Sequence, residues 1–135
     1  MANVLLFVFL GALFVSTAGP VAQPFRDAGE LFAVSQTLGI AHPPGYALYT
    51  LAGNTWSALL LWGTPAYKLN VFSAFLMVFA ALGLRGALRA WGVPSLPSAS
   101  VAALATFSRP SWTAATVSEP YALMAALAAW SARHA

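Results

Sequence analysis

The run LNVFSAFLMVFAALGL, at residues 69–84, contains no charged side chain and decides the fold class of this chain. A helix needs about 20 mostly apolar residues to cross the hydrocarbon core of a bilayer. The run reaches that length when its flanking residues are included, and Arg85 and Arg89 follow it directly. We therefore predict that residues 67–90 form a transmembrane helix, the second of the chain.

The composition of the whole chain agrees with a membrane protein. Of its 135 residues, 60% are hydrophobic and only 7% are charged, whereas soluble domains carry about 25% charged residues. So few charges cannot cover a water-exposed surface, but a lipid-exposed surface needs none. The net charge of +3 comes without a cluster of Lys or Arg, so nothing supports a nucleic-acid partner. The absence of Cys excludes disulfides and thiolate metal sites.

Apolar runs on both sides of residues 67–90 predict an all-α, polytopic membrane protein. Residues 2–18 form the predicted first transmembrane helix. The alternative is a signal peptide with small residues at its cleavage zone, although no Lys or Arg precedes the run. Residues 98–135 are predicted to form further membrane helices. The last run, Tyr121–Trp130, is too short to cross a bilayer, so we expect the chain (residues 1–135) to be the N-terminal part of a larger membrane domain.

Residues 20–66 are predicted to be an external loop that contains short helices. One helix covers Leu31–Leu38, and Gly39 is its expected C-terminal stop. The following His-Pro-Pro-Gly segment breaks the chain, because proline lacks a donor N–H and restricts the residue before it. A second helix then covers residues 44–62, with Pro44 as its first residue.

The orientation of the chain is predicted from Arg85 and Arg89, because Lys and Arg near helix ends favour the cytoplasmic side. If residues 44–62 lie at the membrane interface, residues 20–66 and 108–118 face the outside. If residues 44–62 span the membrane instead, the two arginines fall outside, against the rule. Polar residues within this stretch suit an interface better than lipid. We expect the first arrangement, in which all three acidic side chains share the outer face.

Two carboxylates, Asp27 and Glu30, are spaced as neighbours on a helix and head its apolar stripe. One interpretation is a capping box, in which Asp27 caps the helix and Glu30 reaches back to it. The other is a general base held at the membrane surface, which must reach the proton that it removes. The two interpretations are compatible, since a capped carboxylate can still face a substrate. Asp27 and Glu30 are therefore the candidate catalytic residues.

Four further ionisable residues are candidates for substrate binding. His42 can carry a proton or bind a phosphate, although a lone His beside two prolines is more often structural. Arg26 and Arg109 can pair with the phosphate oxygens of an anionic head group, while a snorkelling interfacial arginine is the alternative for Arg109. Glu119 precedes Pro120, and an acid favoured at a helix start is its simpler explanation. The sequence contains no recognisable metal-ligand cluster, nucleophile elbow or phosphate-binding glycine loop.

Several motifs occur in a specific order along the chain. They are Arg26-Asp27-Ala28-Gly29-Glu30-Leu31, Leu38-Gly39-Ile40-Ala41-His42-Pro43-Pro44-Gly45-Tyr46-Ala47-Leu48-Tyr49, Lys68-Leu69-Asn70-Val71-Phe72-Ser73-Ala74, Ser111-Trp112 and Ser118-Glu119-Pro120-Tyr121-Ala122-Leu123. Together they resemble the N-terminal part of the bacterial membrane-protein family related to transmembrane protein 260, over about residues 20–130. That family belongs to the GT-C class of membrane glycosyltransferases.

The resemblance implies a polytopic α-helical enzyme. Such an enzyme takes a sugar from a polyprenyl-phosphate carrier and passes it to an acceptor hydroxyl outside the cytoplasm, and protein O-mannosylation is one such reaction. The key acidic residue of the family lies in the first external loop, which here is Asp27 with Glu30 beside it. Tyr121, in the last motif, joins the substrate-binding residues. Family members commonly carry Ser where this chain has Ala28, and an aliphatic residue where it has Pro120.

The implied partners are membrane lipid, a polyprenyl-phosphate-linked sugar donor and an acceptor protein or glycan. No cofactor is expected, while a divalent metal stays open. The implied location is the inner membrane of a bacterium, with the active site facing the periplasm or the exterior. Because ionisable groups avoid lipid, we expect the site residues to gather in one cavity at that surface, roofed by residues 44–62. Two other functions stay open: a transporter with a broken helix at the His-Pro-Pro-Gly segment, or a non-catalytic membrane subunit.

Overall fold

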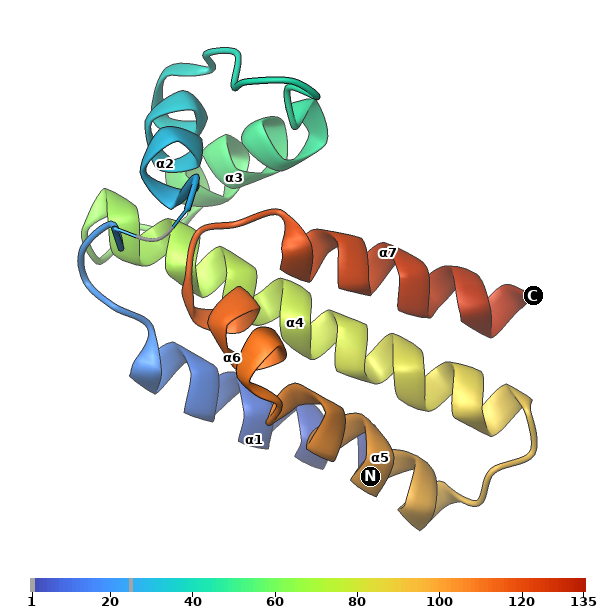
Figure 1. The fold of residues 1–135 in the computed structure, drawn as a ribbon. Helices are drawn as coiled ribbons and strands as arrows, with labels where there is room; N and C mark the ends of the chain where they lie inside the picture. The colour runs from blue at the N-terminus through green and yellow to red at the C-terminus, as the bar shows by residue number, and fades with distance from the viewer. Residues whose placement is uncertain (1, 25) are drawn as a thin grey trace.

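A computed structural model of the chain describes residues 2–24 and 26–135, and over these residues the fold is entirely helical (Figure 1). Seven helices and no strands are found in the described residues. In chain order they are α1 (Ala2–Thr17), α2 (Ala28–Thr37), α3 (Ala47–Leu59), α4 (Pro65–Ala90), α5 (Ser95–Thr106), α6 (Arg109–Thr116) and α7 (Tyr121–His134). The predicted all-α fold class is therefore confirmed.

Helix α4 is the centre of the bundle, and each of the other six helices contacts it. It runs side by side with α7, while α1, α5 and α6 cover its other sides (Figure 1). Large side chains of α1, such as Leu10 and Phe14, belong to the same buried core as Val78 of α4. The buried residues that α5, α6 and α7 contribute to this core are alanines, and such small side chains let helices approach closely.

The close approach is clearest where Gly83 of α4 meets Trp130 of α7. A Cβ atom at Gly83 would lie 2.7 Å from Cδ1 of Trp130. The indole Nε1 of Trp130 donates to the carbonyl of Phe79 over 3.0 Å, and the two rings stack. A side chain at position 83 would therefore displace a ring that is held by both a hydrogen bond and a stacking contact.

Among the described helices, only α4 is long and apolar enough to cross a membrane. Its 26 residues rise about 39 Å, which exceeds the roughly 30 Å of a hydrocarbon core. Helix α1 is apolar but has 16 residues, and α5, α6 and α7 have 12, 8 and 14. The polytopic arrangement, with α1 as a first crossing and residues 98–135 as further membrane helices, therefore stays a prediction.

Helices α2 and α3 form a layer over the N-terminal end of α4 (Figure 1). The side-chain amide of Asn54 in α3 donates to the carbonyl of Ser35 in α2 over 2.8 Å, and Leu31 and Tyr49 share one buried cluster. Helix α3 has 13 residues, or about 20 Å of helix, which is too short to cross a bilayer. Its length favours the interfacial alternative for residues 44–62.

The boundaries of these two short helices differ from those that the sequence predicts. Helix α3 begins at Ala47 rather than Pro44, and it also ends earlier than predicted. The cause is the His42–Gly45 turn, which a 2.8 Å backbone hydrogen bond between its two end residues closes. The left-handed residue that ends α2 is Leu38, with φ 53°, rather than Gly39.

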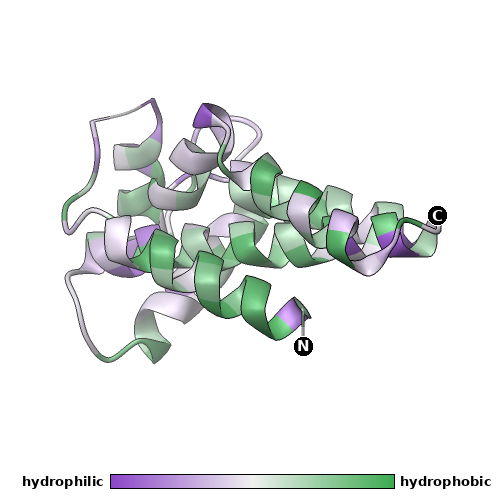
Figure 2. Cartoon of the chain, turned by 90° about the horizontal axis from the view of Figure 1, so that it is seen from below, coloured by the Kyte–Doolittle hydropathy of each residue, from purple (hydrophilic) through white to green (hydrophobic). Residues whose placement is uncertain are grey.

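Polar segments gather at the two ends of the bundle, and the middle is apolar. Figure 2 shows mostly hydrophobic residues along the centre of the long helices and hydrophilic residues at both extremities. The loop that carries Arg26 and Asp27 lies at the N-terminal end of α4, while Arg85 and Arg89 lie at its C-terminal end. Because charged groups avoid hydrocarbon, this distribution is typical of a helix bundle that lies in a membrane.

The two ends of α4 should face opposite sides of the membrane. In intact cells, a cysteine introduced by Ala22→Cys should react with a membrane-impermeant maleimide, and one introduced by Leu96→Cys should stay protected. Both positions are exposed in the structure, and Arg85 and Arg89 favour the cytoplasm for the end near Leu96. Residues 1–135 contain no cysteine, so each label reports one position once any cysteine elsewhere in the complete protein is replaced. Both variants must react in permeabilised cells, and the reverse pattern in intact cells would invert the orientation.

Candidate active site

The start of α2 does not form the capping box that was one of the two interpretations of Asp27 and Glu30. Asp27 occupies the N-cap position, but its side chain makes no capping hydrogen bond. Glu30 turns to His42 instead. Its Oε1 accepts from the backbone N–H of His42, and its Oε2 pairs with the ring Nδ1, both over 2.7 Å. The capping interpretation is wrong because His42 offers Glu30 two partners at once, and the carboxylate thereby ties α2 to the turn before α3.

These contacts shift the pKa values of both partners. The backbone N–H and the ring of His42 lower the pKa of Glu30 below its usual 4.5. The Glu30 carboxylate raises the pKa of His42 above its usual 6.5. Both side chains are therefore mostly charged at pH values between 4.5 and 6.5. They are partly exposed to solvent, which screens the attraction between them.

His42 also faces the second carboxylate of this loop. Its Nε2 lies 3.8 Å from Oδ2 of Asp27. Both carboxylates raise the pKa of His42, so the protonated ring can face Glu30 with Nδ1 and Asp27 with Nε2. The ring packs edge-on against Tyr46, with 5.5 Å between centroids. These contacts define the carboxylate–histidine cluster of Asp27, Glu30 and His42, which can accept a proton from a hydroxyl placed against it.

The same cluster is the part of the described chain that can hold a divalent cation. One ligand atom from each of Asp27, Glu30 and His42 lies within 4.8 Å of the others. The sequence revealed no such cluster because Glu30 and His42 are 12 residues apart, and only the fold of the loop brings them together. Both oxygens of Glu30 are engaged by His42, so a cation would have to compete with this ion pair.

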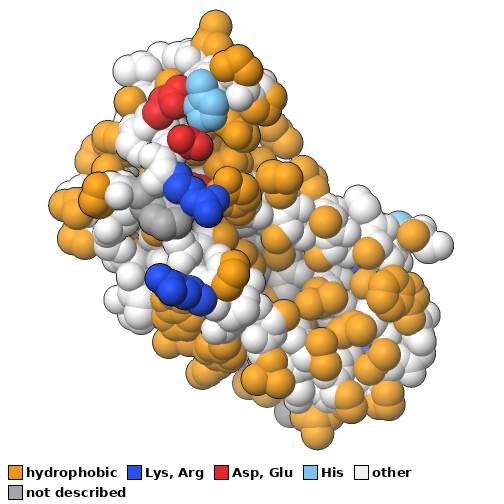
Figure 3. Space-filling view, in the orientation of Figure 1, with side chains coloured by type: hydrophobic (Ala, Val, Ile, Leu, Met, Phe, Trp, Pro, Cys, Tyr) orange, Lys and Arg blue, Asp and Glu red, His pale blue; other side chains and the backbone are white. Residues whose placement is uncertain are grey.

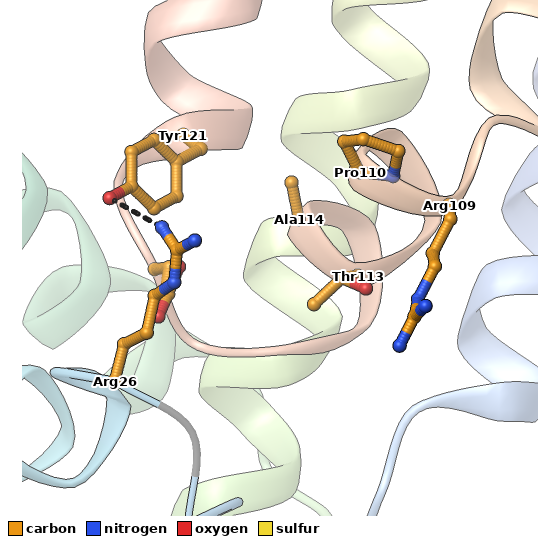
Figure 4. Close-up of a pocket in the computed structure, with 7 residues that line it drawn as sticks. Arg26, Arg109, Pro110, Thr113, Ala114 and Tyr121 are labelled. Carbon is orange, nitrogen blue, oxygen red and sulfur yellow. Dashed lines mark hydrogen bonds between the residues drawn. The ribbon is translucent and has the colours of Figure 1, made fainter.

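A cavity of about 510 Å³ opens on the same face of the molecule, and two arginines stand in its wall. Figure 3 shows acidic, histidine and basic side chains gathered on this face. In Figure 4, Arg26 and Arg109 lie on opposite sides of the small side chains of α6. The Arg26 Nη1 donates to the hydroxyl of Tyr121 over 3.3 Å. The residues that line the cavity are Arg26, Arg109, Pro110, Thr113, Ala114, Glu119 and Tyr121.

Two guanidinium groups around one cavity suit an anion with several oxygens, such as a phosphate. Each guanidinium can donate two parallel hydrogen bonds to such a group. The Arg26 guanidinium also lies 5.8 Å from the centroid of the Tyr121 ring, which limits its freedom. Arg26 is therefore held in place at one side of the cavity, while Arg109 enters from the start of α6.

The third carboxylate, Glu119, lies in the wall of the cavity just before α7. It is 2% exposed, and its Oε1 has no hydrogen-bond partner among the described residues. Burial raises the pKa of Glu119, while the charge of Arg26 lowers it and that of Asp27 raises it. A buried carboxyl with an unsatisfied oxygen can bind a hydroxyl of a ligand, because the hydrogen bond offsets its desolvation.

A buried amide that the sequence analysis did not single out joins the two segments that carry the site. Asn70 is fully buried near the start of α4. Its Nδ2 donates to the carbonyl of Gly19 over 2.9 Å, and its Oδ1 accepts from the hydroxyl of Ser118 over 2.6 Å. The amide thus connects the loop before Arg26 to the loop that bears Glu119. The available signal was a polar residue at the head of an otherwise apolar run.

The structure places the predicted site residues in two neighbouring groups. The peptide bond between Arg26 and Asp27 connects them. The predicted roof of a single cavity, residues 44–62, contributes no lining residue in the described part of the chain, and α6 forms the wall instead. The first group is the carboxylate–histidine cluster, and the second is in the cavity wall: Arg26, Arg109, Glu119 and Tyr121.

Comparison with known proteins identifies related sequences. Residues 27–132 match the family described as the protein O-mannosyl-transferase TMEM260 N-terminal domain. The chain is 31% identical over 128 residues to the protein O-mannosyl-transferase TMEM260 of Mus musculus, an alignment that covers 90% of this chain and 17% of that protein. It is 35% identical over 81 residues to the protein O-mannosyl-transferase tmem260 of Dictyostelium discoideum, which covers 58% of this chain and 10% of the relative. No solved structure matches the chain significantly.

The Glu30–His42 pair should make stability depend on pH at both limits. The stability that ionised Glu30 gains from the pair is complete above pH 4.5. It is lost as pH falls through the lowered pKa of Glu30. The stability that protonated His42 gains from the pair is complete below pH 6.5. It is lost as pH rises through the raised pKa of His42. NMR of labelled histidine, with His134→Gln for assignment, should give His42 a pKa above 6.5 that returns toward 6.5 in Glu30→Gln. An unchanged His42 pKa in that variant would contradict the pair.

Loss of the Asn70 amide should uncouple the two site segments. Asn70→Leu leaves the Ser118 hydroxyl and the Gly19 carbonyl without their partner, and each unsatisfied buried group costs about 1–3 kcal/mol. Thermal unfolding in detergent should show a larger loss for Asn70→Leu than for Ser118→Ala. The double variant should be less destabilised than the sum of the two, because the residues share one hydrogen bond. Strictly additive losses would show that this bond contributes nothing.

Proposed function

The chain belongs to the family of the TMEM260 N-terminal domain, and on this premise we propose that the complete protein is a membrane glycosyltransferase. It transfers a sugar from a polyprenyl-phosphate carrier to an acceptor hydroxyl, and protein O-mannosylation is the reaction named for both relatives. The observation that carries the proposal is a carboxylate–histidine cluster on the same face as a cavity with two arginines. The cluster offers a base for the acceptor, and the arginines offer a site for the donor phosphate.

Asp27 acts as the general base in the proposed reaction. The acceptor oxygen attacks the anomeric carbon of the sugar while Asp27 takes the hydroxyl proton, and the bond between that carbon and the phosphate oxygen breaks. Asp27 suits this role because its side chain is 49% exposed and makes no capping bond that would occupy it. His42, held by Glu30, lies 3.8 Å away and faces the same carboxylate.

Arg26 and Arg109 bind the phosphate, which leaves with the polyprenyl chain. Negative charge grows on the departing phosphate oxygen as the bond breaks, and a guanidinium already in position stabilises that charge. The hydroxyl and ring of Tyr121 keep Arg26 at the cavity. Glu119, buried in the same wall with an unsatisfied oxygen, binds a hydroxyl of the sugar.

The membrane setting of the proposal follows from the apolar helices. Helix α4 is long and apolar enough to cross a bilayer, and its N-terminal end carries the cluster and the cavity. With Arg85 and Arg89 on the cytoplasmic side, the reaction takes place on the outer face, at the inner membrane if the host is a bacterium. The lipid carrier can then stay in the bilayer while its phosphate reaches the arginines.

A transporter and a non-catalytic subunit are the two alternatives to the enzyme, and each makes a different prediction. A transporter would need ionisable groups within its membrane helices, and residues 69–84 contain none. A non-catalytic subunit would tolerate replacement of Asp27 without any change in transfer. Mutation of Asp27 therefore distinguishes the enzyme from a non-catalytic subunit.

Asp27→Asn in the complete protein should lower sugar transfer by about 10²–10⁴-fold, the usual contribution of a general base. The amide keeps the shape of the carboxylate but cannot take the proton. Stability should stay nearly unchanged, because Asn is about as good an N-cap as Asp and the Asp27 side chain makes no capping bond. The measurement is transfer from a polyprenyl-phosphate sugar to an acceptor peptide in membranes, beside the midpoint of thermal unfolding.

Thr55→Val is the matched control, since among the described residues the Thr55 hydroxyl bonds to the carbonyl of Leu51 in its own helix. It should leave transfer unchanged. Full transfer activity in Asp27→Asn would remove Asp27 as the base and direct attention to Glu30. Loss of activity together with loss of the folded protein would instead show a structural role.

A further inference from the structure

A second basic site lies at the C-terminal end of α4, far from the candidate active site. A cavity of about 340 Å³ opens there between α1, α4 and α7. Arg85 and Arg89 come from consecutive turns of α4, and Arg133 comes from the last turn of α7. The residues that line the cavity are Asn3, Leu82, Arg85, Gly86, Arg89, Ala90 and Arg133.

These three arginines converge although their charges repel each other. Like charges four residues apart on a helix are destabilising, and Arg85 and Arg89 have this spacing. Gly86 makes room for the third arginine, because a Cβ atom at Gly86 would lie 2.8 Å from Cδ of Arg133. The sequence at this point therefore favours close contact between α4 and Arg133, where a larger residue would hold them apart.

The hydrogen-bond partners of Arg85 and Arg89 are all uncharged. Arg85 bonds to the side-chain oxygen of Asn3, and its Nη2 donates to Ser95 over 2.9 Å. Arg89 donates to the carbonyl of Val93 over 2.7 Å. The side-chain carboxylates of the chain all lie near the other end of α4, in the cluster and the cavity described above. The described residues thus place three positive side chains around one cavity without an acidic side chain beside them.

One donor at this site is also unsatisfied. The Nε of Arg85 is buried and has no hydrogen-bond partner among the described residues. A buried donor without a partner costs free energy, and more so when it belongs to a charged group. The guanidinium of Arg133 lies 4.9 Å from the centroid of the Trp130 ring, which limits its freedom. The site therefore offers hydrogen-bond donors and positive charge to an anionic oxygen-rich group.

We propose that this cavity binds the phosphate of an anionic phospholipid head group. The site lies at the end of the helix that is long and apolar enough to cross a bilayer, so head groups are the anions nearest to it. Trp91, 64% exposed, stands at the same end of α4, and tryptophans are enriched at the level of the head groups. Basic pockets between membrane helices bind such head groups on the cytoplasmic side. The site does not depend on the proposed glycosyl transfer.

The test measures how phosphatidylglycerol stabilises the complete protein. The protein is placed in nanodiscs of phosphatidylcholine, phosphatidylglycerol is added in steps, and the midpoint of thermal unfolding gives an apparent affinity. The wild type should gain stability with phosphatidylglycerol. The Arg89→Gln/Arg133→Gln double variant should bind it about 25-fold more weakly, since each basic side chain near an anionic surface contributes roughly fivefold. Arg85 is left unchanged because it bonds to Asn3 and Ser95.

Lys68→Gln is the matched control, because it removes one positive charge at the opposite end of α4. It should leave the response to phosphatidylglycerol intact. If the double variant does not fold, Arg133→Gln alone provides the test, with about a fivefold loss expected. An undiminished response in the arginine variants, or an equal loss in Lys68→Gln, would overturn the site. If inorganic phosphate stabilises the protein as strongly as the lipid does, the cavity takes free phosphate and the assignment to a lipid is wrong.

Discussion

Every other helix of this chain packs on α4, and the packing depends on how closely its neighbours can approach. Small side chains let helices approach closely, and the contact then comes from dispersion and close fit. Alanines supply the fit on α5, α6 and α7, and Gly83 supplies it where the Trp130 ring lies against α4. Larger residues at these positions would separate the helices and move the loops that carry the site.

The same apolar helix confines the charged groups to its two ends. An ionisable side chain in hydrocarbon is costly unless it is paired or reaches water. The acidic residues therefore lie at the same end as Arg26 and Arg109, while three arginines gather at the other end. Asn70 is the polar exception inside the bundle. Its amide is fully buried but makes hydrogen bonds on both sides, and it uses them to hold the two site loops together.

The candidate site could be predicted in part from local patterns. The spacing of Asp27 and Glu30 marked them as neighbours, and the scarcity of charges marked each ionisable residue as a candidate. The same local reasoning produced the wrong capping box, because capping rules consider only the residues of one helix. It could not weigh His42, which lies outside that helix and offers Glu30 both a backbone and a ring partner. Nor could it identify the role of Asn70, whose partners lie in two distant loops.

The sequence by itself determined the all-α class and the position of the long apolar helix, and it predicted that the acidic residues share one end of that helix. These properties depend on hydrophobic length and on residue spacing within one segment, which are local. Only the tertiary structure decided which groups meet. Arg26 bonds to Tyr121, which is 95 residues away in the sequence. Glu30 bonds to His42, at the first position of the His42–Gly45 turn that precedes the start of α3 at Ala47. These two contacts do not follow from the spacing of residues within a single helix. They form because helices pack and loops close in the tertiary structure.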